Sequence, residues 1–530
     1  MARKARRKMA VAWCALASAL VAAASALPRA ADNSADDDQF ALPEGLLIGA
    51  GVAAIQTEGA WDADGKSESA ADHVVHTGKL SAMGYGDPHL HDVAADSYRR
   101  YQEDIDKAAE LKLKLYRFSI AWTRVLPTAD ATKPNAAGVK YYHDLIDAIL
   151  AKGMVPFATM FHFDHPQILE DQFHGWQSEQ MVDKFVEYAR FLFNEYSGKV
   201  KLWNTINEPN MYCTYFPAAF VRAGLYKQEE ANHFQCVHHV VLAHAAAYRA
   251  FHQDGHTGQV GINVLMTHAR PATTRPEDAY AADAWNQMYH GLVLHPVVFG
   301  DYPQLVKDVA KDKVTEFTDA QRASLRDSTD FVGFNVYFGL TASYKDPNTP
   351  TGNASMAMGS ILDNLPFITV KTTGVDSNDP QAGFSSILPD AIRSALLWSW
   401  ESYNKPLIVT ENGLGGSNDE LRAPYFSAFL RTMVSTIKEF NIKVIAYCAW
   451  SLIDSFEWSA GFSRPFGLVH VDYGNGTDGT LTRSLKPSSQ FWIDLADTGV
   501  VPFVAKPNAA SSSAASSAVL VLGLVAALFR

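Results

Sequence analysis

Short apolar runs of strand length recur along this chain, and they constrain its fold more than any other feature. Eight of them show little polar alternation, which is typical of strands buried on both faces in a parallel sheet. Segments with helical periodicity lie between several of them, at residues 92–111, 139–151 and 179–196. Alternation of strands and helices over eight strands predicts a single (β/α)8 TIM barrel. The eight runs are Leu46–Ile55, Leu113–Ala121, Met154–Phe163, Val200–Ile206, Val260–Met266, Phe331–Tyr337, Pro406–Thr410 and Ile442–Leu452.

The rest of the chain fits one domain rather than several. We find no linker and no internal repeat between residues 41 and 500, so we assign this whole stretch to the barrel. A chain of 530 residues can form one barrel with insertions. The alternative fold is a doubly wound open sheet. No Gly-x-Gly-x-x-Gly segment follows the first run, which argues against the dinucleotide-binding form of that fold.

The N-terminus has the pattern of a secretory signal. A basic start at residues 3–8 precedes a stretch rich in Ala, Val and Leu, and Ala24-Ser25-Ala26 fits a small-residue cleavage site. We therefore predict a signal peptide over residues 1–26 and a secreted, extracellular protein. Residues 27–40 are polar and acidic and predict a loose leader. An N-terminal membrane anchor is the alternative, but the stretch is shorter than the about 20 strongly apolar residues that a span needs.

The C-terminal tail, residues 501–530, resembles a signal for a glycolipid (GPI) anchor. Small residues at 508–510 are followed by a Ser/Ala spacer and then by an apolar segment at 518–529. The tail predicts attachment to the cell surface through a lipid, with a frayed tail as the alternative. Asn353 and Asn475 begin N-glycosylation sequons, which suits a secreted glycoprotein.

Charge and cysteine content limit the partners and the redox chemistry. The formal net charge is −12, and the chain has no basic cluster outside the signal. We therefore expect no nucleic acid as a partner. Three cysteines remain after the signal: Cys448 lies in an apolar run and is expected to be a buried thiol, whereas pairing of Cys213 with Cys236 is left open.

Two glutamates stand at the ends of apolar runs about two hundred residues apart. Glu208 follows Thr205-Ile206-Asn207, and Glu411 follows Val409-Thr410. A buried carboxylate is costly unless it has partners or a task. A barrel gathers the carboxyl ends of its strands at one rim, and paired carboxylates carry out glycoside hydrolysis. The other polar or aromatic side chains that we place at strand ends on this rim are Gln56, Arg117, His162, Tyr337 and Trp450.

Seven segments around these residues carry a resemblance to a known family. They are Gln56-Thr57-Glu58-Gly59-Ala60-Trp61, Tyr116-Arg117-Phe118-Ser119-Ile120, His162-Phe163-Asp164-His165-Pro166-Gln167, Asn204-Thr205-Ile206-Asn207-Glu208-Pro209, Phe334-Asn335-Val336-Tyr337, Thr410-Glu411-Asn412-Gly413, and Ala449-Trp450-Ser451-Leu452 with its continuation through Phe456-Glu457-Trp458 to Phe466-Gly467. Their order and spacing resemble glycoside hydrolase family 1, the β-glucosidase family, over nearly all of residues 40–500. Within that family the chain looks most like secreted animal members, including insect digestive enzymes.

The resemblance implies a retaining glycosidase that acts on β-D-glucosides or related β-hexosides and needs no cofactor. Glu208 matches the family's acid/base and Glu411 its nucleophile, which forms a covalent glycosyl-enzyme. Arg117 and Tyr337 are expected to keep Glu411 ionised and aimed. Asn335 and Phe466 fall in matching segments and are expected to support the site. The expected partner is a small-molecule β-glycoside or an oligosaccharide.

Six further matches predict the sugar pocket. Gln56, His162, Asn207 and Glu457 can form hydrogen bonds with hydroxyl groups, and Trp450 and Trp458 offer apolar platforms for a sugar ring. A carboxylate at Glu457 would repel a 6-phosphate, so we expect an unphosphorylated hexose.

Three departures from the family's usual pattern affect substrate preference. His162-Phe163-Asp164-His165-Pro166 replaces His-Trp-Asp-Leu-Pro, Ser69-Ala70-Ala71-Asp72 lacks the Trp of Ser-Ile-Trp-Asp, and Asn210 stands where an aromatic residue is common. The choice among glucosides, galactosides and fucosides therefore stays open.

The sequence leaves two alternatives to the hydrolase and raises the question of a metal site. A thioglucosidase needs less acid help, and some lack the acid glutamate; a non-catalytic carbohydrate-binding ectodomain would not need either glutamate. The presence of Glu208 and Glu411 favours an O-glycosidase over both. His162, Asp164 and His165 could suggest a metal, but on a strand the first two would share a face while His165 points away. We therefore expect no metal site.

Overall fold

A computed structural model describes residues 37–79, 88–345, 361–373, 382–475 and 478–507. Residues 1–36, 346–360 and 508–530 lie outside this part. The predicted signal peptide, the part of the predicted anchor tail at 508–530 and the sequon at Asn353 therefore fall outside the described residues.

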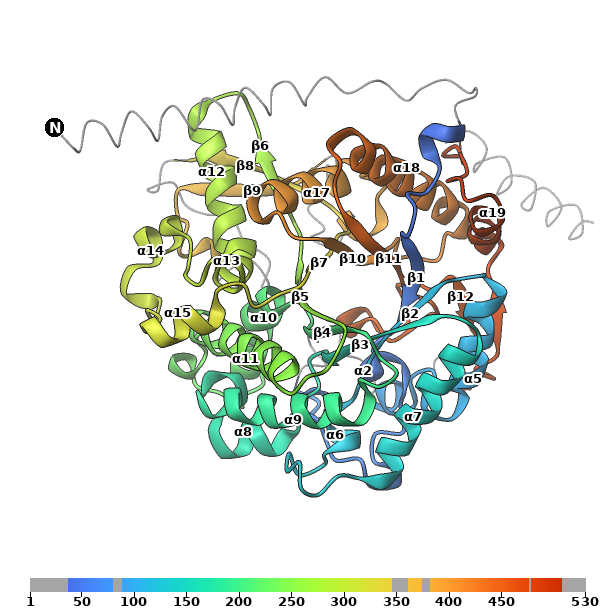
Figure 1. Cartoon of the computed structure of the whole chain (residues 1–530), viewed down its shortest axis with the longest axis horizontal. Helices are drawn as coiled ribbons and strands as arrows, with labels where there is room; N and C mark the ends of the chain where they lie inside the picture. The colour runs from blue at the N-terminus through green and yellow to red at the C-terminus, as the bar shows by residue number, and fades with distance from the viewer. Residues whose placement is uncertain (1–36, 80–87, 346–360, 374–381, 476–477, 508–530) are drawn as a thin grey trace, which may run out of the picture.

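Eight parallel strands close into a barrel, in the order β1-β11-β10-β7-β5-β4-β3-β2. Helices ring the strands on the outside (Figure 1). The predicted (β/α)8 fold is therefore confirmed, and the doubly wound alternative is wrong because the sheet has no open edge. The barrel strands are β1 (Leu47–Gly51), β2 (Leu115–Ser119), β3 (Val155–Phe161), β4 (Leu202–Ile206), β5 (Gln259–Leu265), β7 (Val332–Asn335), β10 (Leu407–Asn412) and β11 (Val444–Trp450).

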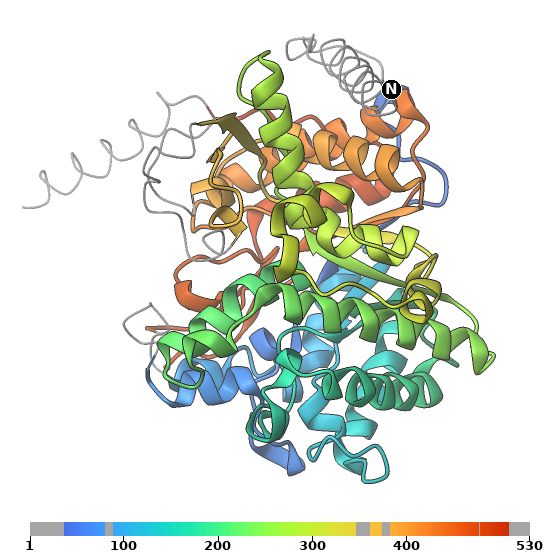
Figure 2. The same cartoon turned by 90° about the vertical axis from the view of Figure 1, so that its left-hand side faces the viewer.

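The outer layer consists mainly of helices that follow the strands, and Figure 2 shows several of them from the side. Two of the three expected helices match α7 and α9, but the one expected over 92–111 is two helices. The break falls at Ala94 and Asp96, which both adopt positive φ. The principal helices are α4 (Pro88–Val93), α5 (Ser97–Glu110), α7 (Ala136–Ala151), α9 (Gln180–Tyr196), α10 (Pro209–Arg222), α11 (His233–Gln253), α12 (Pro276–Asn286), α13 (Leu292–Phe299), α14 (Gln304–Ala310), α15 (Asp319–Leu325), α17 (Asp390–Tyr403), α18 (Arg422–Phe440) and α19 (Gln490–Thr498).

Two small sheets accompany the barrel. One joins β6 (Ala269–Pro271), β8 (Leu340–Tyr344) and β9 (Ile368–Thr372), and the other pairs β12 (Val469–Val471) with β13 (Arg483–Leu485). Within the described ranges, no helix has the length and apolar character needed to cross a bilayer.

Six of the eight barrel strands end before their apolar runs do, and the differences at β1 and β3 change the placement of predicted site residues. β1 stops at Gly51, and a short helix, α2 (Ala54–Thr57), carries Gln56. β3 stops at Phe161, because Phe163 has a left-handed φ of 72° that no regular strand tolerates. The strand alternation that we used to separate His162 and Asp164 from His165 is therefore wrong.

An apolar plug fills the barrel at the amino-terminal ends of its strands. Gly261 on β5 makes room for it, because a Cβ there would lie 2.5 Å from the ring of Phe331. Phe331 also packs edge-on against Phe157, with the ring centroids 6.1 Å apart. The thiol of Cys448 is free and buried here, as predicted. The plug consists of Leu115, Phe157, Leu202, Phe331, Ile408, Ala446 and Cys448.

The two ends of the folded unit form a clasp. Residues Asp37–Phe40, which we placed in the loose leader, form a 3-10 helix, and the Phe40 ring lies 3.4 Å from the Arg431 guanidinium carbon. The backbone of residues 40–42 pairs with that of residues 499–501: Leu42 N donates to Gly499 O at 2.8 Å, and Val501 N donates to Phe40 O at 3.0 Å. The folded unit therefore begins before residue 41.

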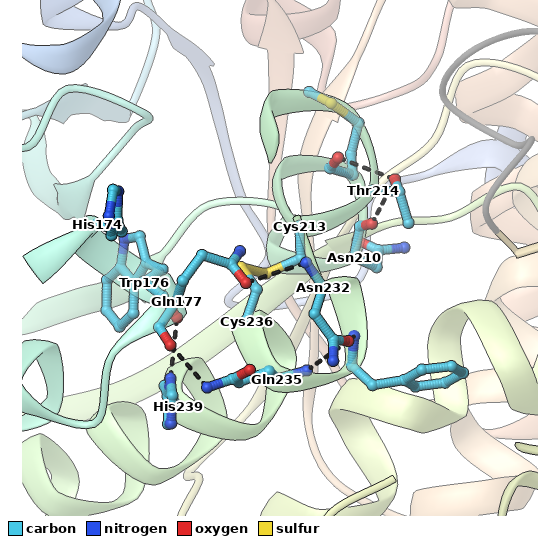
Figure 3. The surroundings of a disulfide bond; sticks show 12 residues. His174, Trp176, Gln177, Asn210, Cys213, Thr214, Asn232, Gln235, Cys236 and His239 are labelled. Atoms are coloured by element: carbon cyan, nitrogen blue, oxygen red, sulfur yellow. Dashed lines mark hydrogen bonds between the residues drawn. A yellow bond between two sulfur atoms is a disulfide. The ribbon is translucent and has the colours of Figure 1, made fainter. Parts of the chain in front are cut away.

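A disulfide joins α10 to α11 through Cys213 and Cys236 (Figure 3). Their Cα atoms are 5.6 Å apart, within the ordinary range for a disulfide. Asn232 caps α11 beside it, because its Oδ1 accepts hydrogen bonds from the backbone N–H groups of Phe234 and Gln235. The structure thus shows that Cys213 and Cys236 pair, which the sequence left open.

Candidate active site

The predicted rim residues meet at the carboxyl ends of the barrel strands. Glu411 lies within β10, whereas Glu208 lies two residues beyond the end of β4. Glu208 adopts a left-handed φ of 44° and occupies the position that precedes α10. Both side chains are nearly buried, and their residues are 6 % and 4 % exposed for Glu208 and Glu411 respectively. A strained backbone at a buried carboxylate is typical of a functional position.

Both oxygens of Glu411 are held by donors. Arg117 Nη1 lies 2.5 Å from Oε1, and the Tyr337 hydroxyl donates to Oε2 at 2.7 Å. Burial and the Glu411 charge raise the pKa of Tyr337 well above its usual value, so the phenol keeps the proton it donates. A cation and a hydroxyl on one carboxylate stabilise its charged form.

Glu208 sits in a different environment. Burial raises the pKa of its carboxyl to about 8, and the Glu411 charge acts in the same direction. Asn335 Nδ2 donates to Oε1 at 2.7 Å and, with Arg117, opposes that rise. At neutral pH the site therefore pairs a protonated Glu208 with a carboxylate that is held by a cation.

Asn207 forms hydrogen bonds with several of the residues around the two glutamates. Its Oδ1 accepts from Arg117 Nη2 at 2.7 Å, from Asn263 at 2.9 Å and from Asn335 at 3.3 Å. Its Nδ2 lies 3.3 Å from Nε2 of His162. Burial and the Arg117 charge hold the pKa of His162 well below its usual value, so this imidazole is neutral and can accept that hydrogen bond.

Aromatic rings gather on the side of the site near β11. The Trp450 ring lies nearly parallel to that of His162, with centroids 6.0 Å apart. Trp458 packs against Phe163 at 5.5 Å and against Phe216 at 5.9 Å. These flat faces suit the apolar face of a sugar ring.

The surroundings of Glu457 differ from the expectation in one respect. Glu457 accepts from the Ser455 hydroxyl at 2.8 Å, with Gln56 and Trp450 beside it. Burial raises the pKa of Glu457 to about 8, with a smaller contribution from the Glu411 charge. The carboxyl is therefore mostly neutral at pH 7, so the charge repulsion that we expected against a 6-phosphate is weak in the free site. Gln56 reaches this region from α2, where its Nε2 donates to Phe456 O at 2.8 Å.

Two of the remaining predicted residues, Asn335 and Phe466, also lie at this site. Asn335 touches Glu208, as described, and the Phe466 ring packs edge-on against Tyr337 with centroids 5.8 Å apart. Asn475 lies in an exposed turn between β12 and β13, where its Nδ2 donates to Asp478 Oδ2 at 3.2 Å.

Sequence reasoning missed three buried polar residues of the barrel interior: Asn204 on β4, Asn263 on β5 and Thr410 on β10. Asn263 links Asn207 to Asn335, and Thr410 donates to Asn335 Oδ1 at 2.5 Å. A signal was present, because an Asn inside an apolar run is costly without partners.

One departure from the family pattern, Asn210, has a local explanation, whereas nothing in the structure explains the Ala at position 71. Ser69 and Asp72 form a capping box at the start of α3 (Ala70–His76). Asn210 Nδ2 donates to Leu265 O at 2.9 Å, and Leu265 N donates to Asn210 Oδ1 at 3.0 Å. An amide at position 210 therefore ties the first turn of α10 to the end of β5, which an aromatic side chain could not do.

Comparisons with known proteins agree with this geometry. The sequence model of glycosyl hydrolase family 1 matches residues 38–500. A cyanidin 3-O-glucoside 7-O-glucosyltransferase (acyl-glucose) from Delphinium grandiflorum is 34% identical, over 85% of this chain and 89% of its own length. β-Glucosidase 6 from Oryza sativa subsp. japonica is 34% identical, over 86% and 91% respectively. These two relatives are plant proteins, so they lend no support to the expected likeness to animal members.

Two solved structures extend the likeness to the whole fold. A rice β-glucosidase superposes with a TM-score of 0.77 at 33% identity, covering 86% of this chain and 98% of that one. An aphid myrosinase gives a TM-score of 0.77 at 29% identity, covering 87% and 100% respectively. The barrel, the paired glutamates and the match over 38–500 lead to one conclusion: the chain belongs to glycosyl hydrolase family 1.

Proposed function

We propose that this protein is a retaining β-glycosidase that hydrolyses β-D-glucosides through a covalent glycosyl-enzyme. One observation carries the proposal: Glu411 is held between Arg117 and Tyr337, whereas burial and the Glu411 charge keep Glu208 protonated. Two carboxyl groups with opposite protonation states are what a double displacement requires at its start.

In the first step, a carboxylate oxygen of Glu411 attacks the anomeric carbon. The bond from that carbon to the leaving oxygen breaks, and Glu208 gives its proton to that oxygen. The products are a glycosyl ester of Glu411, the free alcohol and an ionised Glu208. Asn207 Nδ2, which faces His162, is placed to donate to a sugar hydroxyl near the reacting carbon.

In the second step, the ester formed at Glu411 changes the pKa of Glu208. Esterification removes the Glu411 charge that helped to raise it, so Glu208 becomes a stable carboxylate. It then takes a proton from water as the water attacks the anomeric carbon. Glu411 leaves with its bonding electrons, and both groups return to their starting states.

The relatives suggest two variations on this chemistry. A myrosinase cleaves an S-glycoside, for which acid help matters less, and the protonated Glu208 here favours an O-glycoside. A glucosyltransferase that uses an acyl-glucose would pass the same glycosyl-enzyme to an acceptor alcohol instead of water. Product analysis with and without an added alcohol separates hydrolysis from transfer.

A mechanism-based 2-fluoro-glucoside with a good leaving group tests the proposal. We expect it to inactivate the protein with one adduct, which mass spectrometry of peptides locates on Glu411. The Glu411→Gln variant, which keeps the size of the side chain, should take up no label. Absence of labelling in folded protein that still binds glucosides would favour a carbohydrate-binding protein instead.

We also propose that the protein is secreted, N-glycosylated and held at the cell surface by a lipid anchor. The signal-like residues 1–26, the exposed Asn475 and the tail at 501–530 support this. The Cys213–Cys236 disulfide suits an oxidising compartment. A phosphatidylinositol-specific lipase should release the protein from intact cells, and retention after treatment would count against the anchor.

A further inference from the structure

Four buried asparagines form a continuous chain of hydrogen bonds beneath the two glutamates; we call them the amide chain. Asn204 Nδ2 donates to Asn263 Oδ1 at 2.6 Å. Asn263 Nδ2 donates to Asn207 Oδ1 and to Asn335 Oδ1, both at 2.9 Å. All four are at most 1 % exposed. Asn263 is the branch point, so one side chain touches the two amides that lie nearest the reacting groups.

Arg117 determines which way the amide chain is oriented. A guanidinium carries only donors, and Arg117 Nη2 lies 2.7 Å from Asn207. Asn207 must therefore present its oxygen to Arg117, and the Asn263 group that meets this oxygen must be the NH2. The Asn263 oxygen then faces Asn204. The same NH2 also faces Asn335, so Asn335 must present its oxygen as the acceptor.

The consequence reaches Glu208. Because the Asn335 oxygen points at Asn263, its NH2 points at Glu208 Oε1, 2.7 Å away. Thr410 also donates to Asn335 Oδ1, but a hydroxyl can turn and accept instead. A carboxyl group that gains and loses a proton cannot fix the amide either. Two contacts therefore specify the orientation of Asn335: the Asn263 NH2 faces its oxygen at 2.9 Å, and its own NH2 faces Asn207 Oδ1 at the longer distance of 3.3 Å.

We propose that Asn263 is a positioning residue that keeps a hydrogen-bond donor facing the acid/base Glu208. Arg117 fixes the oxygen of Asn207 toward Asn263, and the NH2 of Asn263 in turn fixes the oxygen of Asn335, so the NH2 of Asn335 faces Glu208. This inference rests on the proposed glycosidase function and deepens it. Asn263 does not touch the substrate site in this scheme. It acts through Asn335, and it also anchors the strained Glu208 backbone, whose N–H donates to Asn263 O at 3.1 Å.

Loss of this orientation changes the proton affinity of Glu208 in a definite direction. If Asn335 turns over, its oxygen faces Glu208, where it accepts from the protonated acid and repels the carboxylate. The pKa of Glu208 then rises. The other charged or titratable groups around Glu208 remain as they are: Glu411 from β10, Arg117 from β2, Tyr337 after β7 and Tyr289 from the π-helical turn Gln287–Gly291.

The test is the pH profile of kcat/KM on an aryl β-glucoside, measured for Asn263→Leu, which has a similar shape but no polar atoms. The basic limb reports Glu208 in the free enzyme. A hydrogen bond to a charged group is worth about 1.5–3 kcal/mol, so the limb should move up by about one to two pH units. Asn263→Ser gives a second variant, because its hydroxyl can also donate or accept and fixes no orientation.

Thr205→Val is the matched control. Thr205 is equally buried on β4, and its hydroxyl lies 2.7 Å from His244 Nδ1 and 3.3 Å from Gly261 O, outside the amide chain. It should lower stability without moving the limb. If the limb of both Asn263 variants moves no further than that of Thr205→Val, the inference is wrong. If the wild-type protein fails to hydrolyse any glucoside, the proposed function fails instead.

Discussion

The two ends of the barrel interior are built from the same strands and have opposite chemistry. β2 contributes Leu115 to the apolar plug and, two residues later, Arg117 to the mouth. β10 contributes Ile408 to the plug and Glu411 to the mouth. Residues two apart on a strand share a face, so on β2 the change occurs between two neighbours on that face; on β10 the register shift between Val409 and Glu411 lies between the two residues. Stability and chemistry are thus separated along the strands rather than among them.

The two ends also contribute to the stability of the fold with opposite signs. The plug removes apolar surface from water, which stabilises the fold. The mouth holds Glu208 and the partly buried Glu457, and removal from water raises the pKa of each to about 8. A protein that holds these acids in a buried site gives up stability there. The comparison therefore predicts that changes in the plug affect unfolding, whereas changes in the mouth affect activity.

The largest expected effect is on activity, at the mouth. Glu208→Ala should lower kcat/KM about 10²–10⁴-fold on glucosides with poor leaving groups, because their departure requires a proton. Substrates with acidic phenols as leaving groups should lose much less in the glycosylation step. The measurement is kcat/KM over a series of aryl glucosides. The ratio of the two losses shows how strongly the effect of the mutation depends on the acidity of the leaving group. An equal loss across the series would contradict the acid role.

The next effect is on stability, in the plug. Phe331→Ala removes a fully buried ring that packs on Phe157 and over Gly261, and should cost about 3–5 kcal/mol. Urea unfolding followed by tryptophan fluorescence measures the loss. Where the variant is folded, its kcat/KM should stay close to that of the wild type. A large loss of activity in folded Phe331→Ala would contradict the assignment of stability to the plug and activity to the mouth.

The disulfide should have a somewhat smaller effect. It closes a loop over a sequence separation of 23 residues, and its loss should cost about 3 kcal/mol. The double variant Cys213→Ser/Cys236→Ser should unfold at lower urea than the wild type. A reductant should lower the urea midpoint of the wild type to that of the variant and leave the midpoint of the variant unchanged. A variant whose midpoint still fell with the reductant would contradict this account.

The smallest effect is a pH dependence of stability that originates at the mouth. The Glu208 pKa is about 8 in the folded protein and near 4.5 when unfolded, so the unfolded chain releases its proton first as pH rises. The wild type therefore loses stability between about pH 4.5 and 8. Glu208→Gln cannot ionise and should be more stable by about 1–3 kcal/mol at pH 7, with no difference near pH 4. Parallel stability curves for the two proteins would contradict the raised pKa.

The barrel and its rim could be predicted because each signal was local. A continuous apolar run marks each strand, and closure of the barrel brings the strand ends together, which places Glu208, Glu411 and Arg117 on one rim. The ends of the strands could not be predicted, because the left-handed Phe163 that stops β3 has no signature in its residue type. The pairing register of β10 shifts between Val409 and Glu411, which brings both Thr410 and Glu411 into the mouth.

The hydrogen bonds of the amide chain were beyond prediction for a different reason. Asn263 is separated by more than fifty residues from each of its partners, and only the closed barrel brings these amides together. The disulfide is similar, because a spacing of 23 residues says nothing about a Cα–Cα distance of 5.6 Å.

The clasp at the chain ends allows a rearrangement of the chain order. Residues 41 and 500 form an antiparallel bridge, so the two ends of the folded unit already lie one hydrogen bond apart. A short peptide could join them and a new opening could be made in an exposed loop, giving a circularly permuted enzyme. The bridge precedes β1 and follows α19, so the splice would lie outside the strand ends that carry Glu208 and Glu411.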